Sequence, residues 1–303
     1  MEKARNPLGR TRVGVFGKGG SGKSTLVVLL AKTLRRIGYE VCVLDADSTN
    51  VGLYRALGLT TSPRPLIEHF GGMVFSGGLV TCPVDDPAPL KGADISIDAL
   101  PPEFHALSPD GVHLLVLGKM GQEGPGAGCD GPIAKIARDL RVRLDEGEAV
   151  TLVDFKAGFE DAARGVIPGL DWAVMTVDPT VASIQMACDL KHIVREILSG
   201  VHPATRHLED HRLVELANRI YREAAIGGVS YVLNKIDGDE TEQIIRASLK
   251  ECGIVPIGAI RNDPAVSYSW LRGVSLDETG TGDAMLGIVH NLETTVREHK
   301  AAT

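Results

Sequence analysis

Several features that would assign this 303-residue sequence to a familiar class are missing from it. It has no excess of positive charge, because its formal net charge is −7, whereas broad binding of nucleic acid requires a basic face. No segment reaches the roughly 18 consecutive apolar residues that a membrane-spanning helix needs. Residues 1–10 contain no apolar signal region. We therefore expect a cytoplasmic protein that has neither nucleic acid nor a membrane as its partner.

Paired cysteines at short spacing are also missing. The five cysteines are an odd number and lie far apart in the chain: Cys42, Cys82, Cys129, Cys188 and Cys252. This pattern argues against a disulfide framework and favours a reducing compartment.

The most informative stretch that is present is GKGGSGKST at residues 17–25. An apolar run at 13–16 precedes it and a helix-like run at 26–37 follows it, which is the strand, loop and helix order of a phosphate-binding loop. Glycines keep the loop clear of side chains, so that backbone N–H groups can surround a triphosphate. The loop residues that we expect to contact the nucleotide are Gly17, Lys18, Gly19, Gly20, Ser21, Gly22, Lys23, Ser24 and Thr25.

Two side chains of this loop have predicted chemical roles. Lys23 is expected to reach the β- and γ-phosphates, and the Ser24 hydroxyl to ligate Mg²⁺. The cofactors that we expect are therefore ATP and Mg²⁺.

A second lysine, Lys18, gives the pattern K-G-G-x-x-G-K-S. This pattern resembles the deviant Walker A motif of the MinD/ParA, nitrogenase iron protein and arsenical-pump ATPases, of the SIMIBI class of P-loop NTPases. The resemblance implies an ATP-dependent homodimer in which Lys18 crosses to the partner's nucleotide. Strand-like and helix-like runs also alternate along the chain, which independently predicts an α/β fold with a doubly wound, mostly parallel sheet.

Carboxylates follow two predicted strands. The apolar run 39–44 ends in Asp45 and Asp47, and residues 150–153 end in Asp154. The resemblance implies that Asp47 positions the attacking water and contributes to the Mg²⁺ site through water, and that Asp154 holds Mg²⁺ through water. The alternative is that Asp45 and Asp47 cap a helix expected at 51–57. Gly158 is expected to sense the γ-phosphate, whereas Lys156 departs from the family pattern without an explanation.

The base-binding elements are expected near the C-terminal half. Asn234 and Lys235, with Asp237, form an N-K-x-D sequence that is also a guanine signature. In the resembling families the same asparagine binds adenine, and a loop spanning 256–264, with Pro256 and Arg261, closes over the base. We therefore prefer ATP to GTP, while Asp237 keeps GTP open.

Residues 124–132 form a glycine-rich loop with Cys129, before a helix expected at 133–144. The loop resembles the cluster loop of the nitrogenase iron protein and the metal loop of the CooC-type nickel-insertion ATPase of carbon monoxide dehydrogenase maturation. The resemblance implies that Cys129 faces its twin across a dimer and binds Ni²⁺, Zn²⁺ or a [4Fe-4S] cluster. Neither full ligand set is present. Gly131 stands where the nickel-insertion ATPase has its second cysteine, and residues 156–158, Lys-Ala-Gly, stand where the iron protein has its second ligand. Cys82 is a candidate for the missing thiolate, and simple packing of Cys129 in its loop is the alternative.

The whole chain, 1–303, is predicted to be a single P-loop ATPase domain, with an irregular insertion at about 60–110 and a helical insertion at about 200–227. His207 and His211 in the second insertion fit a solvated helix face better than a metal site. We expect a homodimeric ATPase that acts on an apo-metalloenzyme, most plausibly nickel carbon monoxide dehydrogenase. An iron–sulfur reductase similar to the nitrogenase iron protein and a MinD/ParA-like positioning ATPase are the alternatives.

Overall fold

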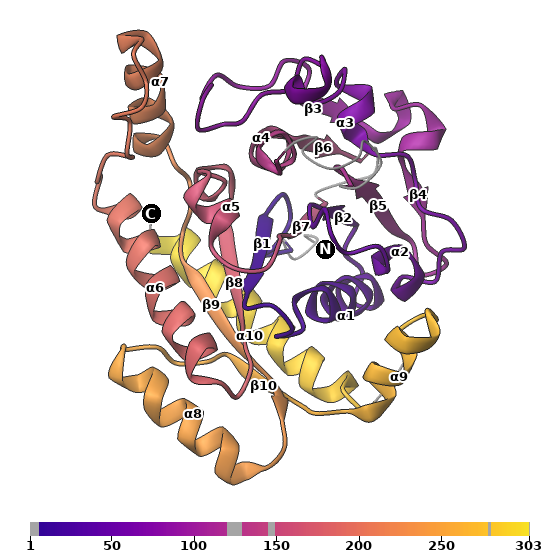
Figure 1. Cartoon of the computed structure of the whole chain (residues 1–303). Helices are drawn as coiled ribbons and strands as arrows, with labels where there is room; N and C mark the ends of the chain where they lie inside the picture. The colour runs from indigo at the N-terminus through magenta and orange to yellow at the C-terminus, as the bar shows by residue number, and fades with distance from the viewer. Residues whose placement is uncertain (1–5, 120–128, 145–148, 278–279, 303) are drawn as a thin grey trace.

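A computed structural model describes residues 6–119, 129–144, 149–277 and 280–302. Its centre is an eight-stranded sheet in which all neighbouring strands are parallel except the edge pair β4–β5 (Figure 1). In spatial order the strands are β10 (Gly258–Arg261), β9 (Val229–Ile236), β8 (Trp172–Val177), β1 (Arg12–Gly17), β7 (Val150–Asp154), β2 (Val41–Asp45), β5 (Val112–Val116) and β4 (Ala106–Leu107).

Helices cover both faces of this sheet. One face carries α1 (Lys23–Arg36) and α10 (Gly282–Ala302), and the other carries α4 (Gly131–Asp139), α6 (Val181–Leu198) and α8 (Asp239–Glu251) (Figure 1). Alternate residues of β2 enter different cores, since Val41 and Val43 pack with α1 while Cys42 and Leu44 pack toward α4. The predicted doubly wound, mostly parallel α/β sheet is confirmed.

The smaller elements surround this sheet. They are α2 (Leu53–Ala56), α3 (Leu66–His69), η1 (Val74–Ser76), β3 (Asp94–Ser96), η2 (Ile97–Ala99), η3 (Pro102–Phe104), β6 (Arg141–Arg143), α5 (Glu160–Ala163), η4 (Ile167–Gly169), α7 (His211–Arg222) and α9 (Pro264–Arg272). Most of the segment at 60–110 consists of short turns and helices, and its strand β3 pairs in parallel with β6.

Two expected helices differ from the observed ones. The helix expected at 133–144 begins at Gly131 and ends at Asp139, because the chain then extends into β6. The helix expected at 51–57 is only the four-residue α2. His207 lies before α7, with a ring nitrogen 2.9 Å from the carbonyl oxygen of Val84, so His207 and His211 do not share a helix.

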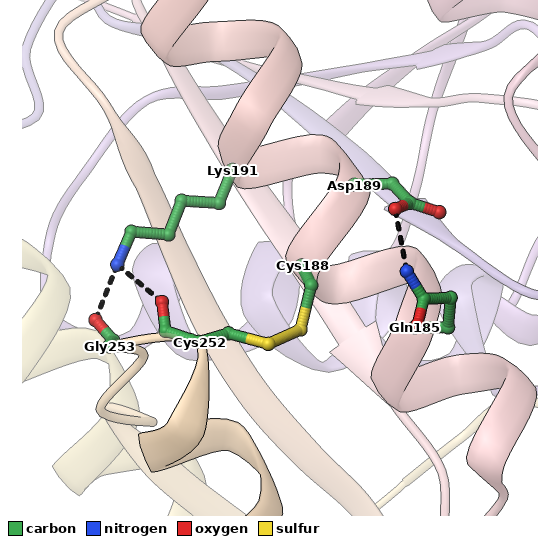
Figure 2. The surroundings of a disulfide bond; sticks show 6 residues. All are labelled: Gln185, Cys188, Asp189, Lys191, Cys252 and Gly253. Carbon is green, nitrogen blue, oxygen red and sulfur yellow. Dashed lines mark hydrogen bonds between the residues drawn. A yellow bond between two sulfur atoms is a disulfide. The ribbon is translucent and has the colours of Figure 1, made fainter.

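A disulfide bond corrects the expectation drawn from cysteine spacing. Cys188 in α6 is bonded to Cys252 just after α8, and the other cysteines, Cys42, Cys82 and Cys129, are free (Figure 2). Lys191 supports the same junction by donating hydrogen bonds to the carbonyl oxygens of Cys252 and Gly253. The sequence did not indicate the pair because 64 residues separate the two cysteines and only the packing of α6 against α8 joins them.

Within the described ranges, every helix is too short or too polar to cross a membrane.

Candidate nucleotide-binding site

The loop between β1 and α1 lies at the carboxyl edge of the sheet, where open α/β folds form their binding sites. Gly20 and Gly22 adopt φ values of 79° and 93°, which favour glycine. A Cβ atom on Gly22 would lie 2.2 Å from Nδ2 of Asn234. Glycine at position 22 is therefore required both by its backbone conformation and by its neighbour.

Strand β9 holds the loop in place. Asn234 donates from Nδ2 to the carbonyl oxygen of Ser21 at 2.8 Å, and Lys235 donates to the carbonyl oxygen of Gly20 at 2.8 Å. Both contacts engage carbonyl oxygens and leave the N–H groups of the loop for phosphates. The sequence led us to expect these two residues at the base, and the structure places them against the loop itself.

Ser24 lies at the start of α1 beside the end of β7. Its hydroxyl donates to Oδ2 of Asp154 at 2.6 Å and accepts from Nδ2 of Asn50 at 2.8 Å. Asp154 is fully buried, and Asp45 lies opposite it in the β2–β7 register. The two residues predicted to hold Mg²⁺ are thus brought together, with Asn50 as a neighbour that the sequence did not single out.

The carboxylates at this edge are electrostatically unsatisfied. Burial, and then repulsion from Asp45, raise the pKa of Asp154 to about 7. Burial raises the pKa of Asp45 to about 6, although Lys119 opposes it. One oxygen of each carboxylate, Oδ1, is buried without a hydrogen-bond partner among the described residues.

These residues fit a Mg²⁺ ion. Mg²⁺ takes oxygen ligands and is typically bound through one or two carboxylates together with substrate phosphates. The described residues contain no group of three or more His, Cys, Asp and Glu side chains arranged for a metal. The Ser24 hydroxyl and the Asp154 carboxylate suit a Mg²⁺ ion whose other ligands are water and nucleotide phosphates.

Asp47 is buried in a tight turn of its own loop. Its Oδ1 accepts hydrogen bonds from the backbone N–H and the hydroxyl of Thr49, at 2.9 and 2.7 Å. Lys119 fixes the same loop, since its ammonium donates to Asp45 at 2.7 Å and to the carbonyl oxygens of Asp47 and Asn50. The sequence analysis missed Lys119, although its place just after β5, at the same sheet edge, was a usable signal.

Two further predicted residues, Lys18 and Gly158, make contacts within or against the phosphate-binding loop. The Lys18 ammonium donates to the carbonyl oxygen of Gly19 at 3.1 Å and lies 3.5 Å from Asp178. The backbone N–H of Gly158 donates to the carbonyl oxygen of Gly17, so the segment after β7 touches the loop directly.

The loop at 256–264, which was expected to close over the base, contacts α8 in this structure. Arg261 forms ion pairs with Asp239 at 2.5 Å and with Glu242 at 3.4 Å. The carbonyl oxygen of Pro256 accepts from Arg246 at 3.5 Å. An approach of this loop to a base remains a prediction.

Two thiols meet at the start of α4. Cys129 accepts a hydrogen bond at Sγ from the backbone N–H of Gly131 at 3.4 Å. A Cβ atom on Gly131 would lie 2.7 Å from Sγ of Cys82 and 3.2 Å from Sγ of Cys129. Cys82 therefore comes from the segment at 60–110 to the place where a side chain at position 131 would point. The glycine run at 124–128, part of the resemblance, lies outside the described residues.

The two sulfurs, which we call the thiol pair, lie among backbone donors. Burial raises the pKa of Cys82, and backbone N–H groups of Val84 and Asp85 oppose this by hydrogen bonding to its sulfur. Bonds of this kind stabilise a thiolate and are usual around sulfur ligands of metals.

Lys156, for which the sequence gave no explanation, is bonded to Asp130. Its ammonium donates to Asp130 Oδ2 at 2.5 Å, while Ser48 donates to Asp130 Oδ1 at 2.6 Å. Burial alone would raise the pKa of Asp130, but these bonds outweigh it and hold the pKa below its usual value. Asp130 therefore connects the residue after Asp47 with the segment after β7.

Comparison with known proteins agrees with this geometry. Residues 15–276 match the CobQ/CobB/MinD/ParA nucleotide binding domain, and the chain belongs to this family. An uncharacterized ATP-binding protein of Methanocaldococcus jannaschii is 29% identical over 268 residues, covering 88% of this chain and 94% of the relative. The carbon monoxide dehydrogenase accessory protein CooC of Rhodospirillum rubrum is 28% identical over 187 residues, covering 61% of this chain and 70% of that protein.

Solved structures show the same fold. The cell division ATPase MinD of Pyrococcus furiosus superimposes with a TM-score of 0.59 at 16% identity, covering 94% of this chain and 99% of MinD. The resemblance to MinD/ParA P-loop ATPases expected from Lys18 and its loop is thereby confirmed, as is a relationship to CooC.

Proposed function

We propose that this chain is an ATP-hydrolysing, homodimeric switch that delivers a metal ion such as Ni²⁺ to an apo-metalloenzyme such as carbon monoxide dehydrogenase. The observation that carries the proposal is the thiol pair Cys82–Cys129 beside Asp130. The carboxylate of Asp130 binds Ser48 in the loop after β2 and Lys156 in the segment after β7, and both segments border the P-loop site. The partial similarity to a carbon monoxide dehydrogenase accessory protein supports this client. The whole chain acts as one ATPase unit with insertions at about 60–110 and 200–227.

Nucleotide binding uses the P-loop and the carboxylate edge. Lys23 neutralises the β- and γ-phosphates, and the N–H groups of the loop surround them. Ser24 would ligate Mg²⁺ directly and Asp154 would hold it through water, and the ion would neutralise charge on the phosphates and lower the raised pKa of Asp154. Asn234, which in this structure bonds to Ser21, and the loop with Pro256 and Arg261, which bonds to α8, would have to turn toward the base to select adenine.

Hydrolysis requires a positioned water and a second protomer. Asp47, whose Oδ1 is held by Thr49 in this structure, orients the water once a nucleotide reorganises that turn. Lys18 leaves Asp178 and crosses to the partner's phosphates. Its bond to Asp178 spans 3.5 Å and its side chain is 31% exposed, so that releasing it costs little, on the order of 1 kcal/mol.

Each protomer contributes Cys82 and Cys129 to the cargo site. Two thiolates per chain supply, across a two-fold axis, the sulfur ligands of a tetrahedral Ni²⁺ or Zn²⁺ site. ATP-driven closure sets the distance between the two pairs and hydrolysis resets it, so metal affinity and nucleotide state are reciprocally coupled.

The crossing lysine provides the test of the switch. We expect Lys18→Ala to bind ATP with nearly unchanged affinity, to remain monomeric with ATP, and to lose at least about a thousandfold in turnover, because a positive charge at the transferred phosphoryl group is missing. Sedimentation and phosphate release measure both properties. Lys250→Ala, an exposed lysine on α8, is the control and should dimerise and turn over normally. Normal turnover of Lys18→Ala would remove the crossing-lysine mechanism.

The number of thiols per dimer also fits one alternative function, that of an iron–sulfur reductase. Four thiolates per dimer are also the ligand set of a [4Fe-4S] cluster, as in a reductase similar to the nitrogenase iron protein. A brown protein that absorbs near about 400 nm after anaerobic purification would identify this alternative. The MinD/ParA-like positioning function has the fold in its favour, and stimulation of hydrolysis by a membrane or DNA surface would identify it.

A further inference from the structure

We propose that Asp130 is a positioning residue that transmits the nucleotide state of the P-loop site to the thiol pair. The inference rests on the proposed function, in which the thiol pair holds the cargo and ATP controls it. It assigns the regulation of that site to a residue outside the P-loop, Walker B and cysteine motifs.

Asp130 lies where three segments meet. It follows Cys129 directly, it is 5% exposed, and it stands at the N-terminal end of α4. One carboxylate oxygen binds Ser48, next to Asp47, and the other binds Lys156, two residues after Asp154. A single side chain thus contacts both segments that surround the γ-phosphate position.

These two segments are the ones that a γ-phosphate reorganises in nucleotide switches. Gly158 donates its N–H to the carbonyl oxygen of Gly17, so the segment after β7 is bonded to the phosphate-binding loop itself. Lys156 is two residues away and moves with Gly158. Ser48 moves with Asp47 when the turn at Thr49 opens.

Asp130 must follow its partners because its charge is buried. The Asp130 side chain is 7% exposed, and leaving a buried carboxylate without its cation is strongly unfavourable, so the pair moves as a unit. Lys156 has a second carboxylate nearby in Glu160, at 3.9 Å. Glu160 is 60% exposed, however, and at that distance it is a weak substitute.

Movement of Asp130 changes the sulfur geometry directly. The peptide that follows Asp130 carries the N–H of Gly131, which binds Sγ of Cys129. On the other side, Gly131 leaves no room for a Cβ atom against Cys82. A shift at Asp130 therefore alters the hydrogen bond on one sulfur and the packing against the other at the same time.

The test measures how fast each thiol is alkylated in different nucleotide states. Cys82 and Cys129 are alkylated with iodoacetamide and followed by peptide mass spectrometry, without nucleotide, with Mg·ADP and with a non-hydrolysable Mg·ATP analogue. In the wild type we expect the rate at one or both thiols to change at least about fivefold between states, the lower end of typical coupling between sites. In Asp130→Asn, which keeps the shape but removes the charge, we expect that dependence to disappear.

Three further variants distinguish a loss of coupling between the nucleotide site and the thiol pair from a general destabilisation of the fold. Lys156→Ala should lose the nucleotide dependence, Lys156→Arg should restore most of it, and Glu160→Gln should leave it unchanged. Each variant is also checked for binding of the same analogue.

The outcomes are distinguishable. Nucleotide-dependent alkylation that persists in both Asp130→Asn and Lys156→Ala would overturn the role of Asp130 and leave the proposed function standing. Identical alkylation in every state of the wild type, with nucleotide bound, would overturn the proposed function and this inference together.

Discussion

At the scale of single residues, the site is defined by two buried carboxylates whose oxygens are only partly paired within the described residues, although Lys119 donates to one of them. Asp45 and Asp154 are adjacent, buried and each left with one unpartnered oxygen among the described residues. Such carboxylates cost stability unless a proton or a cation neutralises them. We interpret this cost as the price of a preformed Mg²⁺ site.

The raised pKa of Asp154 predicts how stability depends on pH. Its pKa rises from 3.8 to about 7, so between these values the folded protein holds a proton that the unfolded chain has lost. The free energy of unfolding without Mg²⁺ should therefore fall as the pH increases from about 4 to about 7. Asp45 and Asp161, with pKa values raised to about 6, contribute in the same direction.

Urea unfolding between pH 4.5 and 8 in the presence of a chelator measures this trend. Asp154→Asn should show a flatter dependence and a higher unfolding midpoint than the wild type near neutral pH. Addition of Mg·ATP should stabilise the wild type more than the variant. Identical pH profiles for the two proteins would contradict the assignment of Asp154.

At the scale of elements, the sequence predicted those features of the fold and site that are encoded by residues close together in the chain. The P-loop, the Ser24–Asp154 arrangement and the parallel sheet follow from short motifs at strand ends, because parallel strands bring their carboxyl ends to a common edge. Other contacts join side chains that are distant in sequence. They are the hydrogen bond from Asn234 to Ser21, the bonds of Lys119 to the loop after β2, and the bonds of Asp130 to Ser48 and Lys156. The place of Lys119 just after β5 signals the sheet edge at which it lies, but no local pattern encodes which partners these side chains contact, which explains why Lys156 had no interpretation before the structure.

The Cys188–Cys252 bond is another long-range contact, and it predicts a stability effect. It joins α6 to the end of α8 across 64 residues, for which chain entropy predicts a stabilisation of about 4 kcal/mol, with about 2–4 kcal/mol typical of measured bonds. The Cys188→Ala/Cys252→Ala variant should lose that amount in guanidinium unfolding.

Reductant is the control for this prediction. It should lower the unfolding free energy of the wild type to that of the double variant and leave the double variant unchanged. Intact-mass measurement after alkylation verifies the redox state. A wild type that is insensitive to reductant while its bond is demonstrably reduced would show that the bond does not support the junction of α6 and α8.

At the scale of the whole molecule, two chains are proposed to close around nucleotide and metal. Asp47→Asn keeps the size of the side chain but weakens its hold on water, so hydrolysis should fall by at least about a hundredfold. Because ATP then persists, the variant should accumulate as an ATP-bound dimer. Light scattering with bound-nucleotide analysis measures this, and wild-type turnover in the variant would remove Asp47 from the mechanism.

The most direct test of the central claim is the metal content of the protein purified without oxygen, measured by mass spectrometry and visible absorption with and without ATP. We predict one Ni²⁺ or Zn²⁺ per dimer, dependent on nucleotide and lost in both Cys82→Ala and Cys129→Ala. Cys42→Ala, which removes a free thiol buried in the core, is the matched control and should keep the metal. A wild type without metal in every nucleotide state, or metal retained in both thiol-pair variants, would contradict the account.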